Sequence, residues 1–360
     1  MSEEPKKRAP RPPLAPLLMV LLFGAGTFWV GGSKKDDSLQ GTSLPTEATD
    51  AASSADPSDA DARPATVGDG AGQGVPIAIT IDDLPAVGRS SIPDIQALTA
   101  ALLDELDRRQ IQATGFVNSG KVAGDDRDER LGFLRQWLDR GHSLANHGAG
   151  HLSPNDVDVE EYLADIERCE PVLDELTDRA WRGPQFYRHP FLHTGADPET
   201  KERIATWLDE RGYRVAPVTH ENHDWMFSAA YDQRLKAGDA EGTAAVVDAY
   251  VEYTDQLFAF WEGVSEQLNG GPHPHVMLLH ANQLNADHFG RVADVMERRG
   301  YRYVTLEEAL EHPIYDRKDT YAGAGGVLWQ LRWAQTDGVE IDWSVVPRPP
   351  EWIAEAFKNG

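Results

Sequence analysis

The chain has 360 residues, a length that suits one large domain with appendages or two small domains. Its formal net charge of −25 at pH 7 argues against nucleic acid or anionic lipid as the main partner. A single cysteine, Cys169, excludes an internal disulfide framework and any multi-cysteine metal site. Since 41% of the residues are hydrophobic, the sequence predicts a sizeable core, and the acidic charge favours a soluble body that does not bind nucleic acid.

Residues 1–32 have the pattern of a targeting segment. Several basic residues and prolines lie within positions 1–13, and residues 14–31 are almost wholly apolar, as in a signal peptide or a single membrane anchor. The positive-inside rule then places the N-terminus in the cytoplasm and the rest of the chain across the membrane. We therefore predict an exported, periplasmic or extracytoplasmic protein that residues 14–31 anchor to the inner membrane if they are not cleaved. A helix buried in a soluble core is the alternative.

Three further regions follow the targeting segment. Residues 33–74 consist mainly of Asp, Ala, Ser, Thr, Pro and Gly, which is the composition of a disordered acidic linker. Residues 75–312 alternate between strand-like and helix-like patterns and form the predicted main domain. Residues 313–360 hold several Trp among many Gly and Pro, and we expect this extension to pack on the domain rather than fold alone.

The main domain has the alternation of a parallel α/β fold. Short apolar runs predict strands at 77–81, 113–118, 143–146, 185–189, 213–218, 275–280 and 301–304. Apolar residues at helical spacing predict helices at 92–110, 128–140, 158–179, 197–212, 243–268 and 286–299, with a short helix after Thr305. Repeated strand–helix units over this length predict a (β/α) barrel. An open doubly wound sheet is the alternative, although no Gly-rich phosphate loop follows the first strand.

Two adjacent carboxylates, Asp82 and Asp83, end the first predicted strand. Carboxylates at the end of an apolar strand are costly to hold near a core unless a cation or a reaction uses them. Because consecutive strand residues point to opposite faces, the two acids are expected to have different roles. A helix N-cap is the alternative, and it accounts for only one of them.

Other polar residues also follow apolar strands, at the edge where a barrel of this kind carries its chemistry. They are His147 and His151, then Arg188, then His223, Asp224 and Trp225, and finally His280. His147 and His151 lie four apart with two glycines between them, which favours a loop that wraps an ion over a metal-binding helix. Two histidines and one carboxylate suit Zn²⁺ hydrolysis and also non-haem Fe²⁺; an unliganded pair of loop histidines is the alternative.

Arg188 and His280 each have two interpretations. Arg188 is either a surface residue or a tether that grips a carboxylate and keeps it ionised. His280 follows an apolar run and is either a satisfied core histidine or a proton donor, a role that suits the near-neutral pKa of imidazole.

Five motifs in this order resemble the polysaccharide deacetylases (carbohydrate esterase family 4, NodB-homology domain). They are Thr80-Ile81-Asp82-Asp83, the segment from His147 to His151, Arg188-His189-Pro190-Phe191, His223-Asp224-Trp225 and Leu278-Leu279-His280. The resemblance covers residues 75–312 and implies a deformed (β/α) barrel of the polysaccharide deacetylase type. It also implies a hydrolase that removes N-acetyl groups from amino-sugar polymers or oligomers in the cell envelope.

The resemblance also implies a division of roles around one divalent metal ion, with Zn²⁺ as the first choice. The metal ligands would be Asp83, His147 and His151. The catalytic residues would be Asp82 as base, Arg188 orienting it, His280 as acid and Asp224 supporting that acid. A backbone N–H at Phe191 would bind the oxyanion, and Trp225 would line the substrate groove.

The chain also departs from the family pattern. Ile81 stands for Phe, Gly148 for Ser or Thr, and His189 for Pro, with His193 following. The helix at 243–268 is an unusual insertion between the fourth and fifth motifs, and we expect it to reshape the groove. Two alternatives stay open: a metal-dependent amidohydrolase acting on a small non-sugar amide, and a non-catalytic glycan-binding relative in the envelope.

Overall fold

The computed structural model describes residues 74–177 and 185–359. The predicted targeting segment and most of the acidic linker lie outside these residues. Within the described part, none of the helices is long and apolar enough to cross a membrane.

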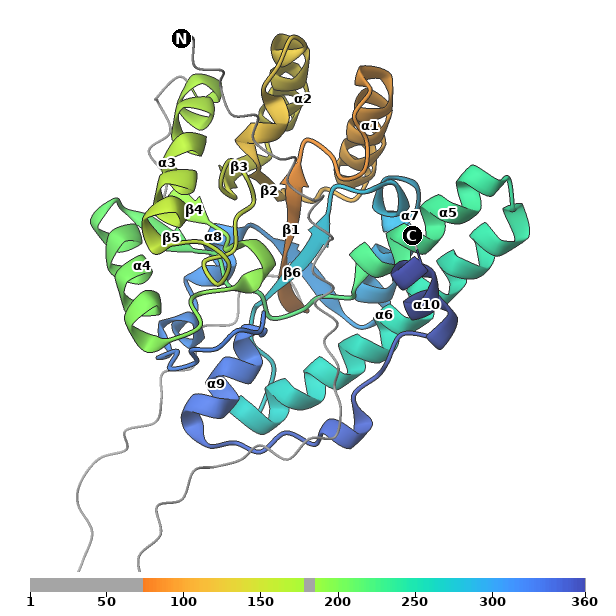
Figure 1. The fold of residues 1–360 in the computed structure, drawn as a ribbon. Helices are drawn as coiled ribbons and strands as arrows, with labels where there is room; N and C mark the ends of the chain where they lie inside the picture. Colours follow the sequence, from red (N-terminus) through yellow and green to blue (C-terminus); the bar gives the residue numbers. More distant parts are fainter. Residues whose placement is uncertain (1–73, 178–184, 360) are drawn as a thin grey trace, which may run out of the picture. The chain divides into compact units, whose positions relative to one another are not determined.

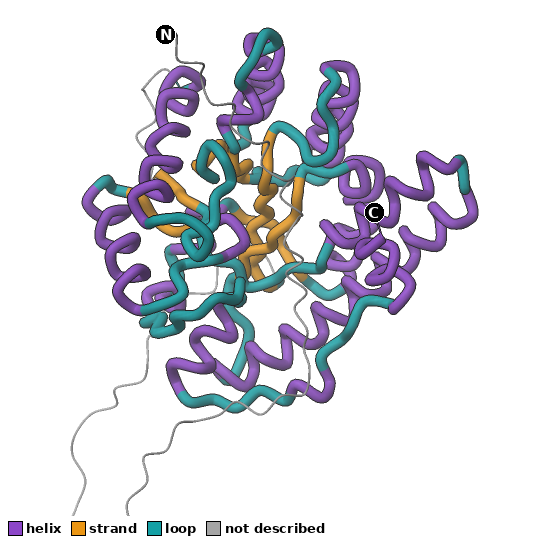
Figure 2. Tube along the Cα trace, viewed as in Figure 1, coloured by secondary structure: helices purple, strands orange, loops and turns teal. Residues whose placement is uncertain are grey.

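A curved parallel sheet lies at the centre of the fold, with helices around it (Figure 2). Its strands are β1 Val75–Leu84, β2 Thr114–Val117, β3 Ser143–Asn146, β4 Gln185–Tyr187, β5 Tyr213–Val215, β6 His275–His280 and β7 Tyr301–Val304. Their order is β5-β4-β3-β2-β1-β6, and β7 pairs with the first residues of β1. A parallel bridge between His220 and Met277 then joins the segment after β5 to β6, which brings the two ends of the sheet together. The predicted deformed (β/α) barrel is therefore confirmed.

The helices connect these strands and cover the sheet (Figure 1). They are α1 Ile92–Arg108, α2 Arg127–Asp139, α3 Val159–Leu176, α4 Pro198–Glu210, α5 Asp224–Ala237, α6 Ala240–Asn269, α7 Gln283–Arg298, α8 Leu306–Leu310, α9 Trp329–Asp337 and α10 Glu351–Asn359. Short 3₁₀ helices occur at η1 Ser119–Val122, η2 Pro190–Leu192, η3 Pro313–Asp316 and η4 Trp343–Val345. The sequence analysis predicts no helix at α5, whose apolar residues lack a regular helical stripe.

Strand β1 is the centre of the sheet because it pairs with β2, β6 and β7. Ile77, Ile79 and Ile81 are buried, and α1 packs Leu98 and Leu102 into the same core. Burying an aliphatic side chain of this size contributes about 1.5–3 kcal/mol, so the sheet and its first helix hold β1 firmly. The residues at the carboxyl end of β1 are therefore held in fixed positions by the packing of the strand.

The C-terminal extension packs on the domain. Helix α9 lies against α6, and α10 lies against α5. Trp333 of α9 is only 1% exposed, and Ile353 of α10 is fully buried. The extension is thereby joined to the helices α5 and α6, which lie far from it in the sequence.

Candidate metal and acid–base site

The carboxyl end of β1 bends at Asp83. Asp82 pairs in register with His280 of β6, but the pairing of β1 with β2 shifts between Ile81 and Leu84. Asp83 has a left-handed backbone, with φ of 74°. The expectation that strand alternation would send the two acids to opposite faces is therefore wrong, because this bulge turns Asp83. Asp82 lies 3.7 Å from His147 Nε2, and Asp83 lies 3.8 Å from His151 Nε2.

Asp83, His147 and His151 form a group that fits one divalent metal ion. One ligand atom from each lies within 4.8 Å of the others. His147 Nδ1 lies 2.8 Å from the Arg188 carbonyl oxygen and so carries the proton, which leaves Nε2 free as a ligand. Burial holds the pKa of His147 well below its usual value and keeps the ring neutral, as a ligand must be. Two imidazoles and one carboxylate are a donor set that Zn²⁺ accepts with open positions.

A lysine that the sequence analysis missed contacts the same carboxylate. Lys121 Nζ lies 3.1 Å from Asp83 Oδ1 and donates to the Asp83 carbonyl oxygen at 3.0 Å. Burial alone would raise the pKa of Asp83, but Lys121 and then His151 lower it below its usual range. Asp83 is therefore ionised and ready to bind a cation. The position of Lys121 just after β2, at the same edge of the barrel, is the sequence feature that could have indicated it.

Asp165 of α3 holds the loop between the two histidines. Its Oδ1 accepts the Gly150 N–H at 2.8 Å, and its carbonyl accepts the Ala149 N–H at 3.1 Å. Gly148 has φ of 76°, and a Cβ there would lie 2.5 Å from Asp165 Oδ2. The close approach of Asp165 therefore requires glycine at position 148, where the family pattern has Ser or Thr. The loop itself is held by its hydrogen bonds to Asp165. Sequence reasoning missed Asp165 because it lies within a helix.

Asp82 and Arg188 form a buried ion pair. The side chain of Asp82 is 3% exposed and that of Arg188 is 0% exposed. Arg188 Nη1 donates to both Asp82 oxygens at 3.3 and 3.2 Å, while its Nε and Nη2 donate to Ala216 O and Thr80 Oγ1. Burial raises the pKa of Asp82 to about 6, although Arg188 acts to lower it. Arg188 is thus a buried tether for a carboxylate, not a surface residue.

His280 and Asp224 form the second acid–base pair of the cluster. His280 Nδ1 lies 2.7 Å from Asp224 Oδ1, and the His280 N–H donates to Asp224 Oδ2 at 2.8 Å. Asn282 and Asn285 donate to Oδ2 as well, so both oxygens of the carboxylate have hydrogen-bond partners. Burial alone would lower the pKa of His280, but Asp224 raises it to about 9. His280 is therefore a protonated imidazole at neutral pH, 18% exposed at the site.

The turn after β4 presents an aromatic ring and a backbone N–H. Phe191 is 54% exposed and its ring lies edge-on to His151, with centroids 4.4 Å apart. Within the described chain, Leu192 N–H donates to His189 O and His193 N–H to Pro190 O, whereas no such backbone bond occupies the Phe191 N–H. The Phe191 N–H is therefore the group of this turn that a ligand could use.

His189 and His193, which flank this turn in the sequence, are both buried. They are 3% and 5% exposed. His189 Nδ1 lies 2.8 Å from Tyr162 Oη, and His193 Nδ1 lies 2.9 Å from Ser153 Oγ. In this chain, these two histidines therefore support the turn through hydrogen bonds to side chains outside it.

Helices α5 and α6 support the acid side of the site. His223, with φ of 54°, precedes α5 and contacts Tyr253 of α6 at 3.0 Å. Trp225 packs edge-on against Phe357 of α10, with centroids 4.8 Å apart. Tyr250 of α6 donates to Asn285, which itself binds Asp224. The inserted helix therefore backs the residues that hold His280.

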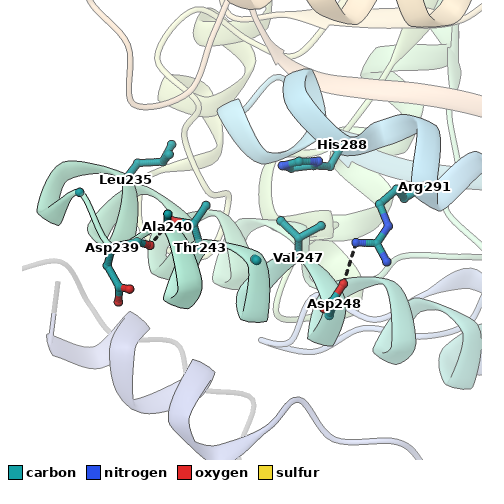
Figure 3. Close-up of a pocket in the computed structure, with 10 residues that line it drawn as sticks. Leu235, Asp239, Ala240, Thr243, Val247, Asp248, His288 and Arg291 are labelled. Atoms are coloured by element: carbon teal, nitrogen blue, oxygen red, sulfur yellow. Dashed lines mark hydrogen bonds and ion pairs between the residues drawn. The ribbon is translucent and has the colours of Figure 1, made fainter.

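A separate pocket of about 440 Å³ lies between α5, α6 and α7 (Figure 3). Its lining includes Val247, His288 and the Asp248–Arg291 ion pair, and none of the residues of the metal and acid–base cluster. This pocket is therefore distinct from the candidate site.

Comparison with known proteins supports the same family. The family model for polysaccharide deacetylase matches residues 69–216. The match confirms the resemblance seen in the motifs over this region of the chain.

Two curated relatives carry specific names. The chain is 25% identical over 149 residues to a peptidoglycan-N-acetylglucosamine deacetylase of Bacillus cereus, covering 41% of this chain and 46% of the relative. It is 21% identical over 236 residues to a chitin deacetylase of Colletotrichum lindemuthianum, covering 65% and 79%. The solved chitin deacetylase from that fungus superposes with a TM-score of 0.47 at 18% identity, covering 66% of this chain and 88% of the other. The match spans less than half the length of the Bacillus relative.

Proposed function

We propose that this protein is a metal-dependent hydrolase that removes N-acetyl groups from amino-sugar polymers or oligomers in the cell envelope. The observation that carries the proposal is the pairing of Asp82 with His280 across β1 and β6, directly beside the Asp83, His147 and His151 group. A carboxylate and a protonated imidazole beside one metal site are an arrangement that suits amide hydrolysis.

A divalent ion, with Zn²⁺ as the first choice, would be held by Asp83, His147 and His151 and would supply Lewis-acid chemistry. Asp82 would accept the proton of the attacking water while Arg188 keeps the carboxylate oriented. The Phe191 N–H would donate to the oxygen that gains negative charge. His280 Nε2 would then donate a proton to the leaving nitrogen, and Asp224 would hold the other ring nitrogen.

The names of the relatives support an N-acetylated glycan as the substrate partner. The exposed ring of Phe191 lies beside His151 and offers aromatic surface that suits the apolar face of a sugar ring, and Trp225, which follows Asp224, is a second candidate for such a contact. The location in the cell envelope rests on residues 14–31 alone and is part of the same proposal.

Acetate release with and without a chelator tests this function. The full chain should release acetate from N-acetylated chito-oligomers or peptidoglycan, lose that activity on chelation and regain it with Zn²⁺. Preference for a small non-sugar amide would favour the amidohydrolase alternative. Glycan binding with no release of acetate from any of these substrates would favour the non-catalytic one and overturn the proposal.

A further inference from the structure

The turn that carries the Phe191 N–H has an unfavourable backbone. Phe191 and Leu192 both have φ of 56°, and neither is glycine. Two consecutive side-chain-bearing residues in the left-handed region persist only where the surrounding structure holds them. The turn must therefore be stabilised by neighbours from elsewhere in the chain.

These neighbours come from residues 319–333, which we call the C-terminal clamp. Its Arg332 is fully buried, and Nη2 donates to the Leu192 carbonyl at 2.6 Å while Nη1 donates to Thr194 Oγ1 at 2.8 Å. The guanidinium also lies over the ring of Trp329, at 4.1 Å from its centroid. One side chain thus grips the turn at two points, a task for which the planar guanidinium is suited.

The charge of Arg332 is balanced within the clamp. Asp319 Oδ2 lies 3.3 Å from Arg332 Nη1 and 2.8 Å from Lys201 Nζ of α4. Lys201 also donates to the Tyr321 carbonyl at 2.7 Å. Helix α4, the clamp and the turn are therefore joined in one hydrogen-bonded network. The C-terminal extension is thus an integral part of the domain at this point.

A glycine of the clamp lies directly against the turn on another side. A Cβ at Gly326 would lie 2.0 Å from the Phe191 carbonyl oxygen, a contact that a real side chain cannot make. Gly323 N–H also donates to Gly195 O at 3.3 Å, just beyond the turn. The clamp consequently contacts the turn along its length, and only glycine fits at position 326.

We propose that the C-terminal clamp sets the orientation of the Phe191 N–H and that Arg332 is a positioning residue for deacetylation. This inference rests on the function proposed above. It assigns the extension after residue 313 a part in the chemistry, because the clamp holds the turn that carries this donor. The oxyanion contact forms only in the transition state, so its loss should lower kcat and leave KM nearly unchanged.

Gly326→Ala is the main test because it adds one methyl group and removes no interaction. We expect kcat on an N-acetylated chito-oligomer to fall at least tenfold, with KM and Zn²⁺ binding within threefold of the unchanged protein. The control is Gly271→Ala, a loop glycine whose added Cβ meets nothing within 4 Å. Arg332→Met should give a similar loss of kcat, whereas Arg317→Met, which removes contacts to Asn269 and Asp337, should not.

Hydrogen exchange of the full chain provides a readout independent of activity. The amides of Leu192 and His193 are bonded within the turn and should exchange faster in Gly326→Ala and Arg332→Met than in either control. If the protein has no deacetylase activity but the two variants still show faster exchange, the clamp is supported and only the proposed function fails. Unchanged exchange and unchanged kcat in a folded Gly326→Ala protein would overturn the inference, as would a loss confined to KM or to metal binding.

Discussion

At the scale of single residues, the site separates two neighbouring acids by their partners. Asp82 faces the Arg188 guanidinium and pairs with His280, whereas Asp83 faces Lys121 and His151. Burial raises the pKa of Asp82, and the surrounding cations lower that of Asp83. The same residue type is thereby placed in two electrostatic environments a single peptide bond apart.

Exchange of each acid for its amide should therefore give different losses. Asp82→Asn should keep Zn²⁺ and the fold while the hydrolytic rate falls about 100-fold or more, the usual scale for a general base. Asp83→Asn should weaken Zn²⁺ binding and lose activity with it, partly restored at high metal concentration. Metal titration beside steady-state kinetics measures both. If Asp82→Asn releases the metal and Asp83→Asn retains it, the two roles are reversed.

Lys121 should oppose the binding of a metal ion. Its ammonium group is a cation beside Asp83 Oδ1, and its side chain is 34% exposed, so solvent screens part of the repulsion. We expect Lys121→Met to bind Zn²⁺ about 10-fold more tightly, equivalent to about 1.4 kcal/mol. Competition against a chelator measures the affinity. Arg127→Met, which removes only an exposed ion pair with Glu175, is the control, and equal affinities in all three proteins would contradict the prediction.

At the scale of elements, short connections between strands and helices hold the candidate metal ligands and the candidate acid. The loop from β3 carries His147 and His151, and α3 supports it through Asp165. The end of β6 carries His280, and the first residue of α5 supports it through Asp224. In both cases a buried carboxylate on a helix fixes a segment that follows a neighbouring strand.

Gly148→Ala tests the support of the histidine loop. The new Cβ would meet Asp165 Oδ2 at 2.5 Å and force a left-handed backbone on a residue with a side chain. We expect a loss of about 1–2 kcal/mol in the free energy of unfolding, together with weaker Zn²⁺ binding. Urea unfolding and metal titration check the two effects. Gly132→Ala in α2, where nothing lies within 4 Å, should leave Zn²⁺ binding unchanged and raise the free energy of unfolding by about 0.5–1 kcal/mol.

Three buried histidines at the opposite end of β6 should make the stability of the fold sensitive to acid. His220, His273 and His275 are buried there, with neighbouring ring centroids 4.2 and 4.3 Å apart. Burial lowers the pKa of His273 to about 3 and holds those of the other two well below normal. These rings stay neutral in the folded state, whereas the unfolded chain takes up protons below about pH 6.5.

Stability should therefore fall as the pH drops from about 6.5 toward 3, by up to about 1.4 kcal/mol per histidine for each pH unit. Urea unfolding at pH 7, 6 and 5 measures this slope. His273→Asn should reduce it by about one histidine's share. A free energy of unfolding that stays constant between pH 7 and 5 would show that the cluster is not held neutral.

At the scale of the whole molecule, the C-terminal extension connects distant parts of the chain. Arg332 binds Thr194 across a separation of 138 residues, and α10 packs on α5 beside Trp225. The extension thus contacts both the turn that carries Phe191 and the helix that supports His280. Its two helices are part of the support of the site.

Residues 14–31 should export the protein and retain it at the membrane. They form an apolar stretch behind a basic flank, and no cleavage position stands out after it. Cell fractionation followed by immunoblotting should find the full-length chain in the membrane fraction. A shorter soluble form outside the cytoplasm would indicate cleavage, and a full-length chain in the cytosol would contradict export.

The sequence by itself determined the resemblance to the polysaccharide deacetylases, the parallel α/β barrel and the polar residues at the strand ends. It could do so because these features are local. A strand or helix shows in the spacing of apolar residues, and the carboxyl ends of parallel strands meet at one edge of the sheet. Asp82, His147, Arg188 and His280 were therefore found one strand at a time.

Only the tertiary structure decided how these residues are held. The bulge at Asp83, the Lys121 contact and the support by Asp165 depend on elements that approach each other through packing. Helix α5 was missed because its burial comes from α6, α7 and α10 and not from an amphipathic pattern. Arg332 and Gly326 act on a turn more than 130 residues earlier, and such long-range contacts leave no periodic trace in the sequence.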